Sequence, residues 1–326
     1  MAAPSRRYAL VMNGSAGSVA GADPEERLKT LAAELQKATG HPPVEATTAK
    51  GKDLAQAVEH AAAGAADVVV IAGGDGTVSY AAPILRKHGK ILAIVPLGTY
   101  NLLARDLEIP LETEDAIATL ASGVVREIDV ATVNGHMFLC QSGFGLFSGV
   151  AYARQKFRKK SMLGKWAQSA MAFADAAWRL RRVGITVRAD GVKHRFRTLA
   201  MLVAINTYHR NPGKMLQRDR LDGGKFALYS VRYRTVAGLI LFAVKLVLGR
   251  WHKDERLDIL ASRHLVVTSR RRRNRTLRRR LAITADGELL FMNTPITYEI
   301  LPRALKILAP APPPSEPGHA PDRASL

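Results

Sequence analysis

Alternating apolar runs and amphipathic segments predict the fold of the first 125 residues. Four short runs of mostly β-branched or aliphatic residues have the length of buried strands, at Tyr8–Met12, Val44–Thr48, Asp67–Ile71 and Ile91–Val95. Between them, the pattern is typical of helices over Pro24–Ala38, Gly51–Ala63 and Val78–Lys87. Strands that alternate with helices imply right-handed crossover connections, so we expect an α/β domain with an open, mostly parallel, Rossmann-like sheet.

From Glu127 onward the pattern changes to shorter runs of β character, which predict a second, β-rich domain resembling a β-sandwich over residues 127–291. The predicted strands are Ile128–Val133, His136–Gln141, Ile185–Ala189, Phe196–Ala204, Phe226–Arg232, Leu265–Thr268 and Leu281–Thr284. Helices are expected near Tyr152–Arg181 and Thr235–Trp251. Residues 309–326 are rich in Pro, Ala and Ser and contain few core-forming residues, which predicts a disordered tail.

Composition narrows the class of protein. With 326 residues and 47% hydrophobic content, the chain can bury enough apolar surface for two domains. Cys140 is the only cysteine, so neither an intrachain disulfide nor a thiolate metal cluster is expected, and the nine histidines include no HExxH pair that would indicate zinc.

Tyr8–Met12 is too short for a signal peptide, and Val236–Leu248 falls short of the roughly 20 residues of a membrane-spanning helix. We expect a cytoplasmic protein in which the second segment is a buried or interfacial helix.

Charge predicts an anionic partner, since 48 Lys and Arg stand against 28 acidic residues, for a formal net charge of +20. Many of the cations fall in two clusters, formed by Arg154, Lys156, Arg158, Lys159 and Lys160 and by Arg270, Arg271, Arg272 and Arg273. Apolar residues such as Trp166 and Trp178 follow the first cluster, as on an interfacial surface, although one helix packed into a core explains them equally well. A solvated hairpin loop is the alternative for the second cluster. Nucleic acid is a weaker explanation, because no zinc-finger spacing or RNA-binding aromatic pattern accompanies the charge.

The segment Gly73-Gly74-Asp75-Gly76-Thr77 directly follows a predicted strand and precedes a predicted helix. Adjacent glycines adopt backbone angles closed to other residues and let N–H groups approach an anion, while the helix directs its positive end toward that anion. We therefore expect a phosphate-binding turn, in which Asp75 could orient Mg²⁺ and Thr77 could bind a phosphate or cap the helix. An ordinary strand-to-helix turn is the alternative.

A second strand, turn and helix start follows at Pro96–Arg105, with Gly98, Thr99 and Asn101 in its turn. Ligands of parallel α/β sheets lie outside the carboxyl ends of the strands, so these two turns are expected to face one nucleotide from two sides. Together the two turns resemble the catalytic domain of the diacylglycerol kinase and sphingosine kinase superfamily, especially its soluble bacterial lipid kinases.

Three further segments support this resemblance. Asn13-Gly-Ser-Ala-Gly17 is similar to a family turn in which proline stands where this chain has Gly14. The segment from Arg218 to Gly223 resembles an acidic stretch that holds a structural Mg²⁺ in some bacterial members, which would make Asp219 and Asp222 metal ligands. Thr284–Glu288 resembles a family segment whose aspartate is the proposed general base.

The resemblance implies an ATP- and Mg²⁺-dependent kinase that phosphorylates a lipid hydroxyl, with diacylglycerol as the first candidate, at the cytoplasmic face of a membrane. The chain would return after the second domain to complete the first through Ile296–Leu301, so that residues 1–126 and about 292–308 form the nucleotide-binding domain and ATP lies between the domains. Asp286 would act as the base and Glu288 would assist it or Mg²⁺. The residues expected around the nucleotide are Asn13, Gly17, Gly73, Gly74, Asp75, Gly76, Thr77, Gly98, Thr99 and Asn101.

The chain also departs from the family pattern. Relatives commonly carry an Asn-Glu pair where this chain has Ser79-Tyr80, and an aspartate where it has Leu102. A catalytically weak, nucleotide-responsive membrane-binding protein therefore remains an alternative, as does an NAD kinase-like enzyme, although the second glycine turn argues against the latter. Asp286 is also explained as an ordinary Asp-Gly hairpin turn, and Asp222 as a turn residue that needs no ion. The acceptor lipid and the oligomeric state are not predicted by the sequence.

Overall fold

The computed structural model describes residues 6–16, 23–158, 183–209, 217–233, 235–269 and 280–311. Its first part is the expected α/β unit, in which the strands β1 (Tyr8–Asn13), β2 (Glu45–Ala49), β3 (Val68–Gly73) and β4 (Ile91–Pro96) pair in parallel in the order β2-β1-β3-β4. The predicted strands and helices are all present, with ends shifted by a few residues. The long apolar runs fit strands that are buried on both faces.

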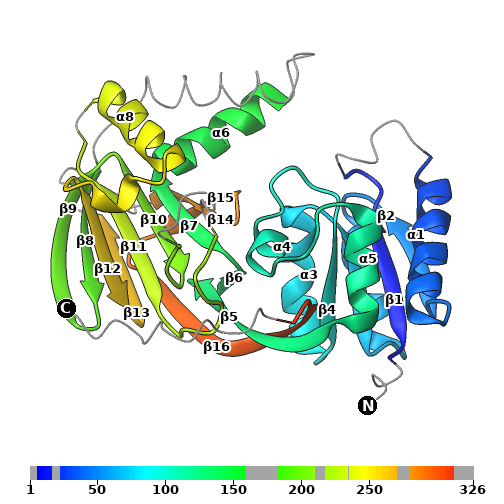
Figure 1. Ribbon diagram of the computed structural model, residues 1–326. Coiled ribbons are helices and arrows are strands. Elements are labelled where there is room, and N and C mark those ends of the chain that lie inside the picture. The colour runs from blue at the N-terminus through cyan, green and yellow to red at the C-terminus, as the bar shows by residue number, and fades with distance from the viewer. Residues whose placement is uncertain are drawn as a thin grey trace, which may run out of the picture.

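Helices cover both faces of this sheet (Figure 1). Leucines of α1 (Pro24–Thr39) and α5 (Thr113–Ser122) pack with β1 on one face, while apolar residues of α2 (Asp53–Ala63) and α3 (Asp75–Lys87) pack with β3 on the other. Asp23 caps α1 by accepting a hydrogen bond from the N–H of Glu25. The short α4 (Leu102–Asp106) begins where a helix start was predicted after the second glycine turn, whereas α5 was not predicted.

One long strand, β16 (Ile296–Ala309), connects the two parts of the molecule. Its far end pairs in parallel with β4 through Ile307 and Leu92, while its beginning pairs with β13 (His264–Ser269). The first sheet therefore continues past β4 as β16-β13-β8-β9, with β8 at Val183–Ala189 and β9 at Val192–Thr198. The sequence predicted a returning strand that ended at Leu301. The pairing with β5 is irregular between Leu301 and Leu305, where Arg303 has a positive φ, and it then continues to Ala309. The domain limits themselves stay a prediction.

The second sheet is antiparallel, with the order β12-β11-β10-β7-β14-β15. Its strands are β7 (Gln141–Gly145), β10 (Ala200–Ile205), β11 (Phe226–Val231), β12 (Leu257–Ser262), β14 (Arg280–Ala285) and β15 (Glu288–Asn293). Its inner face packs on the extension of the first sheet around Tyr298, which is fully buried and contacts the rings of Phe138, Phe144 and Phe226 edge-on. The predicted β-sandwich-like second part is confirmed.

Two predicted strands are in fact pairs of strands that belong to different sheets. The segment Phe196–Ala204 breaks at Leu199, where Thr198 Oγ1 donates hydrogen bonds to the carbonyls of Ala200 and Val231 and the chain passes from β9 to β10. The segment His136–Gln141 divides into β6 (His136–Phe138), which pairs with β5 (Val124–Val133), and β7. A run of β character does not reveal such a change of sheet, because the residues on both sides of the break favour strands.

Two helices lie outside the second sheet (Figure 1). The first, α6, spans Leu146–Arg158, and the remainder of the helix predicted up to Arg181 lies outside the described residues. The second, α8, spans Val236–Val247 and is followed by a 3₁₀ turn, η1 (Trp251–Lys253). In the described part of the chain, no helix has both the length and the apolar character needed to cross a membrane. The tail predicted from residue 309 is described only to residue 311, and Ala309 is still part of β16.

Candidate active site

The first glycine turn joins β3 to α3, and its glycines are required by close packing. Gly74 has φ −91° and ψ −178°, an extended conformation open to any residue, so the expectation that this turn needs unusual backbone angles was wrong. A Cβ on Gly73 would lie 2.7 Å from the Cβ of Thr77, and a Cβ on Gly74 would lie 3.0 Å from the Cα of Gly98. Only Gly76 faces open space, at the first turn of α3.

The second glycine turn joins β4 to α4 and packs directly on the first. A Cβ on Gly98 would lie 2.6 Å from the Cα of Gly74 and 2.5 Å from Oδ1 of Asn101. The Asn101 side chain braces this turn, because its Oδ1 accepts a hydrogen bond from the N–H of Gly98 (3.0 Å) and its Nδ2 donates one to the carbonyl of the same residue (3.1 Å). Thr99 is exposed at the tip. The two turns thus lie side by side, as predicted from the order of the strands.

Asp75 connects the two turns through its carboxylate. Oδ2 accepts a hydrogen bond from the N–H of Asn101 (2.9 Å), and Oδ1 accepts one from the N–H of Leu102 (2.6 Å), which satisfies donors at the start of α4. Burial raises the pKa of Asp75, the two backbone hydrogen bonds oppose that rise, and the nearby charge of Asp286 adds to it. The site therefore holds two carboxylates close enough to repel each other.

Asn13, at the end of β1, ties the first strand to this region. Its Nδ2 donates a hydrogen bond to Oγ1 of Thr77 (2.8 Å), and its Oδ1 accepts one from the N–H of Ser15 (2.9 Å). Thr77 is buried within α3, which no side chain caps, so the capping role of Thr77 is excluded and its phosphate contact stays a prediction. Gly17, the other residue predicted here, lies outside the described residues.

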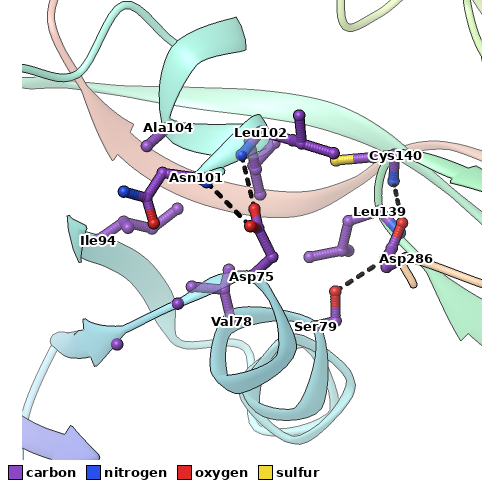
Figure 2. A pocket seen from close by; sticks show the side chains of 13 residues that line it. Asp75, Val78, Ser79, Ile94, Asn101, Leu102, Ala104, Leu139, Cys140 and Asp286 are labelled. Atoms are coloured by element: carbon purple, nitrogen blue, oxygen red, sulfur yellow. Dashed lines mark hydrogen bonds between the residues drawn. The ribbon is translucent and has the colours of Figure 1, made fainter. Parts of the chain in front are cut away.

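Asp286 enters the site from the second part of the molecule (Figure 2). It forms the two-residue turn between β14 and β15 with Gly287, with φ values of +45° and +84°, so the Asp-Gly turn is also a hairpin turn of the usual kind. Its Oδ2 accepts hydrogen bonds from Ser79 Oγ (2.8 Å) and the N–H of Leu139 (2.6 Å), and its Oδ1 accepts them from the N–H groups of Cys140 (2.9 Å) and Gln141 (3.1 Å). Four donors therefore fix this carboxylate.

The two parts of the molecule enclose one small pocket, shown in Figure 2. It is lined by Gly73, Gly74, Asp75, Val78, Ser79, Ile94, Asn101, Leu102, Leu103, Ala104, Leu139, Cys140 and Asp286. Its volume of about 20 Å³ is enough for one water molecule or ion and far too small for a nucleotide. Cys140 is buried in its wall, and this burial raises the pKa of the thiol well above its usual range, which agrees with the predicted buried thiol and leaves it protonated.

Other predicted site residues lie apart from this pocket. Glu288 is mostly exposed and pairs with His136 (3.6 Å). Asp219 pairs with His209 (3.1 Å), whereas Asp222 pairs with Arg220 (2.9 Å) and Arg303 (3.7 Å). Among the described residues, no group of three or more His, Cys, Asp or Glu side chains is arranged to hold a metal ion.

The sequence reasoning missed a buried ion pair next to the site. Nε of Arg218 donates to Oδ2 of Asp106 (2.7 Å), both side chains are almost fully buried, and Nη1 of Arg218 also donates to the carbonyl of Leu139 (2.8 Å). Arg218 thereby holds α4 against the segment Leu139–Gln141, which supplies three of the four donors to Asp286. The only sequence signal for Arg218 was its position at the start of the acidic segment Arg218–Gly223, and that signal does not indicate a buried ion pair.

The two basic clusters are described only in part. Arg154, Lys156 and Arg158 lie on α6, of which the backbone is described at these positions, whereas Lys159, Lys160 and Arg270–Arg273 lie outside the described residues. Their proposed contact with anionic lipid stays a prediction.

The fold brings a largely parallel α/β sheet with paired glycine turns together with a carboxylate from a β-rich second part. Comparison with known proteins gives the class of protein. Residues 7–133 match the family model of the diacylglycerol kinase catalytic domain. The resemblance seen in the sequence is thereby confirmed, and the chain is a kinase, a phosphotransferase with an alcohol group as acceptor.

Known proteins support this assignment along most of the chain. A diacylglycerol kinase of Bacillus subtilis is 28% identical over 268 residues, which cover 80% of this chain and 84% of the relative. A diacylglycerol kinase of Staphylococcus saprophyticus is 27% identical over 175 residues, 53% of this chain and 57% of the relative. The crystal structure of a diacylglycerol kinase from Bacillus anthracis superposes with a TM-score of 0.68 over 94% of this chain and 98% of that one. At 17% identity, this last similarity establishes the fold alone.

Proposed function

We propose that this kinase transfers the γ-phosphoryl group of ATP to the hydroxyl of a membrane lipid, with diacylglycerol as the leading acceptor. The observation that carries this proposal is the pocket in which the two glycine turns and Asp75 face Asp286, a carboxylate delivered by the other part of the molecule. Phosphoryl transfer needs donors around the phosphates and a carboxylate that orients the attacking hydroxyl, and the pocket brings both together. The names of the relatives supply the choice of diacylglycerol.

The nucleotide phosphates would lie at the mouth of the pocket, against the first turn of α3. The open space around Gly76 leaves room for an anion beside that turn, and the positive end of the helix dipole favours an anion there. The extended turn at Gly74 and the exposed turn at Thr99 form the two sides of this mouth. Asn13 holds the first turn through Thr77 and acts by positioning it.

The side chains present fit Mg²⁺ brought in by the nucleotide. Mg²⁺ is usually held by one or two carboxylates together with substrate phosphates, and the Asp75 carboxylate, which accepts hydrogen bonds from Asn101 and Leu102, keeps lone pairs for a cation or its water ligands. The repulsion between Asp75 and Asp286 also favours a cation between them. Bound there, Mg²⁺ would neutralise developing charge on the phosphates.

Asp286 would act as the general base. In the transfer step, the lipid hydroxyl gives its proton to Oδ2 of Asp286, its oxygen forms a bond to the γ-phosphorus, and the bond from that phosphorus to the bridging oxygen breaks, which releases ADP. Ser79 is the one side-chain donor among the four groups bound to this carboxylate, and it would hold Oδ2 in place as the substrate hydroxyl approaches.

The direct test is to incubate the purified protein with labelled ATP, Mg²⁺ and vesicles that contain one candidate lipid each, and to follow the label into the organic phase. Labelling of diacylglycerol by the parent, with loss in Asp286→Asn, supports the proposal. Labelling of another lipid would change the acceptor, and transfer at the parent's rate in Asp286→Asn would remove Asp286 as the base. Membrane binding through the basic clusters is tested by sedimentation with anionic vesicles at matched salt.

One observation favours a second candidate, a nucleotide-binding relative with weak transfer. Asp286 already accepts four hydrogen bonds, and the chain has Tyr80 and Leu102 where relatives commonly carry acids. A carboxylate so fully engaged has no free lone pair with which to receive the proton of the substrate hydroxyl. ATP binding without label in any lipid, by the parent and by Asp286→Asn alike, would select this candidate.

A further inference from the structure

Helix α8 presents a wholly apolar face to solvent. Ile240, Leu241, Val244 and Leu248 are each about half exposed, at 52, 50, 49 and 56%, and their spacing of three to four residues places them on one side of the helix. The neighbouring Ala237, one turn earlier on the same side, is exposed as well. Single exposed apolar residues are ordinary, whereas a continuous row along a helix marks an interaction surface.

The opposite side of α8 is anchored in the protein. Leu239 is buried beside Tyr233 and Leu146, the first residue of α6, while Phe242 and Leu246 pack against a cluster that includes Trp251. A Cβ on Gly238 would lie 2.4 Å from the ring of Tyr233, so the helix sits very close to this tyrosine. The exposed row is therefore held by a fixed helix and is not an incidental result of a loose one.

The only charged residue of α8 is directed toward the protein. Nζ of Lys245 lies 2.8 Å from Oδ2 of Asp254, a buried carboxylate that also accepts a hydrogen bond from the hydroxyl of Tyr233 (2.6 Å). Because this lysine is neutralised on the inner side, the outer row carries no charge along the length of the helix.

Cations surround the end of the apolar row. Arg250 and Lys253 follow α8 directly and are exposed, and within the described part of the chain neither forms an ion pair. Arg256 lies over the ring of Tyr233, the residue two positions before the N-cap of α8, with its guanidinium carbon 5.1 Å from the ring centroid. An apolar row bordered by cations matches the interface of an anionic bilayer, in which apolar groups enter the acyl region and cations meet the headgroups.

From these contacts we infer that the outer face of α8, formed by Ile240, Leu241, Val244 and Leu248, docks on an anionic lipid surface, with Arg250 and Lys253 against the headgroups. The choice of a lipid surface as partner rests on the proposed function. The face lies on the same end of the molecule as α6, whose basic residues were expected to contact lipid (Figure 1). The charge of the chain, +20, favours an anionic bilayer over a second copy of the same chain, because two copies repel each other.

The test compares sedimentation of the full chain with vesicles of phosphatidylcholine alone and of phosphatidylcholine with phosphatidylglycerol. The double variant Ile240→Ser, Val244→Ser is expected to bind the mixed vesicles about tenfold more weakly, because two half-exposed side chains no longer enter the bilayer. The double variant Arg250→Gln, Lys253→Gln is expected to lose roughly tenfold as well, and its binding should depend less on salt. The matched control is Val192→Ser, which removes an equally exposed valine from β9 (60% exposed) and should bind as the parent does.

Each other outcome overturns the inference or separates it from the kinase proposal. Parent-like vesicle binding by the Ile240→Ser, Val244→Ser variant, with its melting temperature unchanged, overturns it. A change in molecular mass by analytical ultracentrifugation without a change in vesicle binding also overturns it and assigns the face to self-association. Transfer to dioctanoylglycerol in detergent micelles reports on the kinase separately, since it needs no bilayer. If that transfer fails while vesicle binding still depends on α8, the kinase proposal falls and the docking face stands.

Discussion

The hydroxyl of Ser79 donates a hydrogen bond to Oδ2 of Asp286 over 2.8 Å, although the two residues are 207 positions apart. Ser79 lies on α3 in the Rossmann-like part, and Asp286 lies in the β14–β15 turn of the second part (Figure 2). This bond is the direct side-chain link between the proposed base and the helix that carries the first glycine turn. It therefore fixes the distance between the phosphate site and the base.

Ser79→Ala is expected to lower kcat for lipid phosphorylation roughly tenfold and to leave ATP affinity nearly unchanged, because the base loses alignment while the glycine turns keep theirs. Stability should fall by no more than about 1 kcal/mol, since Oδ2 still accepts the N–H of Leu139. Steady-state kinetics with varied ATP and varied lipid separate the two effects. Ser79→Asn, which keeps a donor, is the control and should retain more activity, and a parent-like kcat in Ser79→Ala would show that the bond does not position the base.

Asp286→Asn is expected to abolish transfer and also to destabilise the fold by about 2 kcal/mol. An amide has one accepting oxygen, so its NH₂ group must face backbone N–H groups that the carboxylate now satisfies. Urea unfolding measures the stability, and ATP binding shows whether the first part remains intact.

Asp190→Asn provides the matched control for that substitution. Asp190 and Gly191 form the same kind of turn between β8 and β9, and the Asp190 carboxylate accepts hydrogen bonds from the N–H groups of Arg263 and His264. This variant should lose stability and keep transfer, because it is not part of the pocket. Equal loss of transfer in both variants would attribute the effect of Asp286→Asn to unfolding.

Gly98→Ala and Gly76→Ala should separate packing from ligand binding. A Cβ at residue 98 would overlap the Cα of Gly74, so we expect a loss of roughly 2 kcal/mol in unfolding free energy together with weaker ATP binding. A Cβ at residue 76 meets nothing within 4 Å, so Gly76→Ala should unfold like the parent or later and still bind ATP at least tenfold more weakly, because the methyl group occupies the phosphate site. Calorimetry of ATP binding beside thermal melts checks both, and tight ATP binding by Gly76→Ala would place the phosphates elsewhere.

The anchor of α8 should make stability depend on pH. Burial by itself would raise the pKa of Asp254, but hydrogen bonds from Lys245, Tyr233 and the N–H of Arg256 outweigh it and hold this pKa below its ordinary value. A lowered folded-state pKa stabilises the protein above the unfolded value near 4 and ceases to do so as the pH falls through the folded value. Urea midpoints of the parent and Asp254→Asn should therefore differ at pH 7, and the gap should begin to shrink as the pH falls below about 4. Asp258→Asn, which breaks a surface pair with Arg232, is the control and should follow the parent throughout, and a gap for Asp254→Asn that stays constant with pH would contradict the assignment.

The order of apolar runs was enough to predict the first part of the fold. Buried parallel strands are continuous apolar runs, and the connecting helices have a different period, so Tyr8–Asn13 through Ile91–Pro96 could be located without tertiary information. The glycine turns followed from their place after β3 and β4. The division of Phe196–Ala204 between two sheets was not predicted, because residues on both sides of Leu199 have β character, although β9 is largely exposed and β10 is fully buried.

Two identical tripeptides show most clearly which properties of the site residues the sequence determines and which depend on the tertiary structure. Ala-Asp-Gly occurs at Ala189–Gly191 and at Ala285–Gly287, and the sequence by itself determines that both form tight hairpin turns, since Asp and Gly tolerate positive φ. Local chemistry does not distinguish the two aspartates. Only the tertiary structure places Asp286 beside Ser79 and Asp75, because the pairing of β14 with β7 directs the Asp286 hairpin toward the glycine turns. The pairing of β8 with β13 instead holds the Asp190 hairpin against the start of β13, on a distant turn.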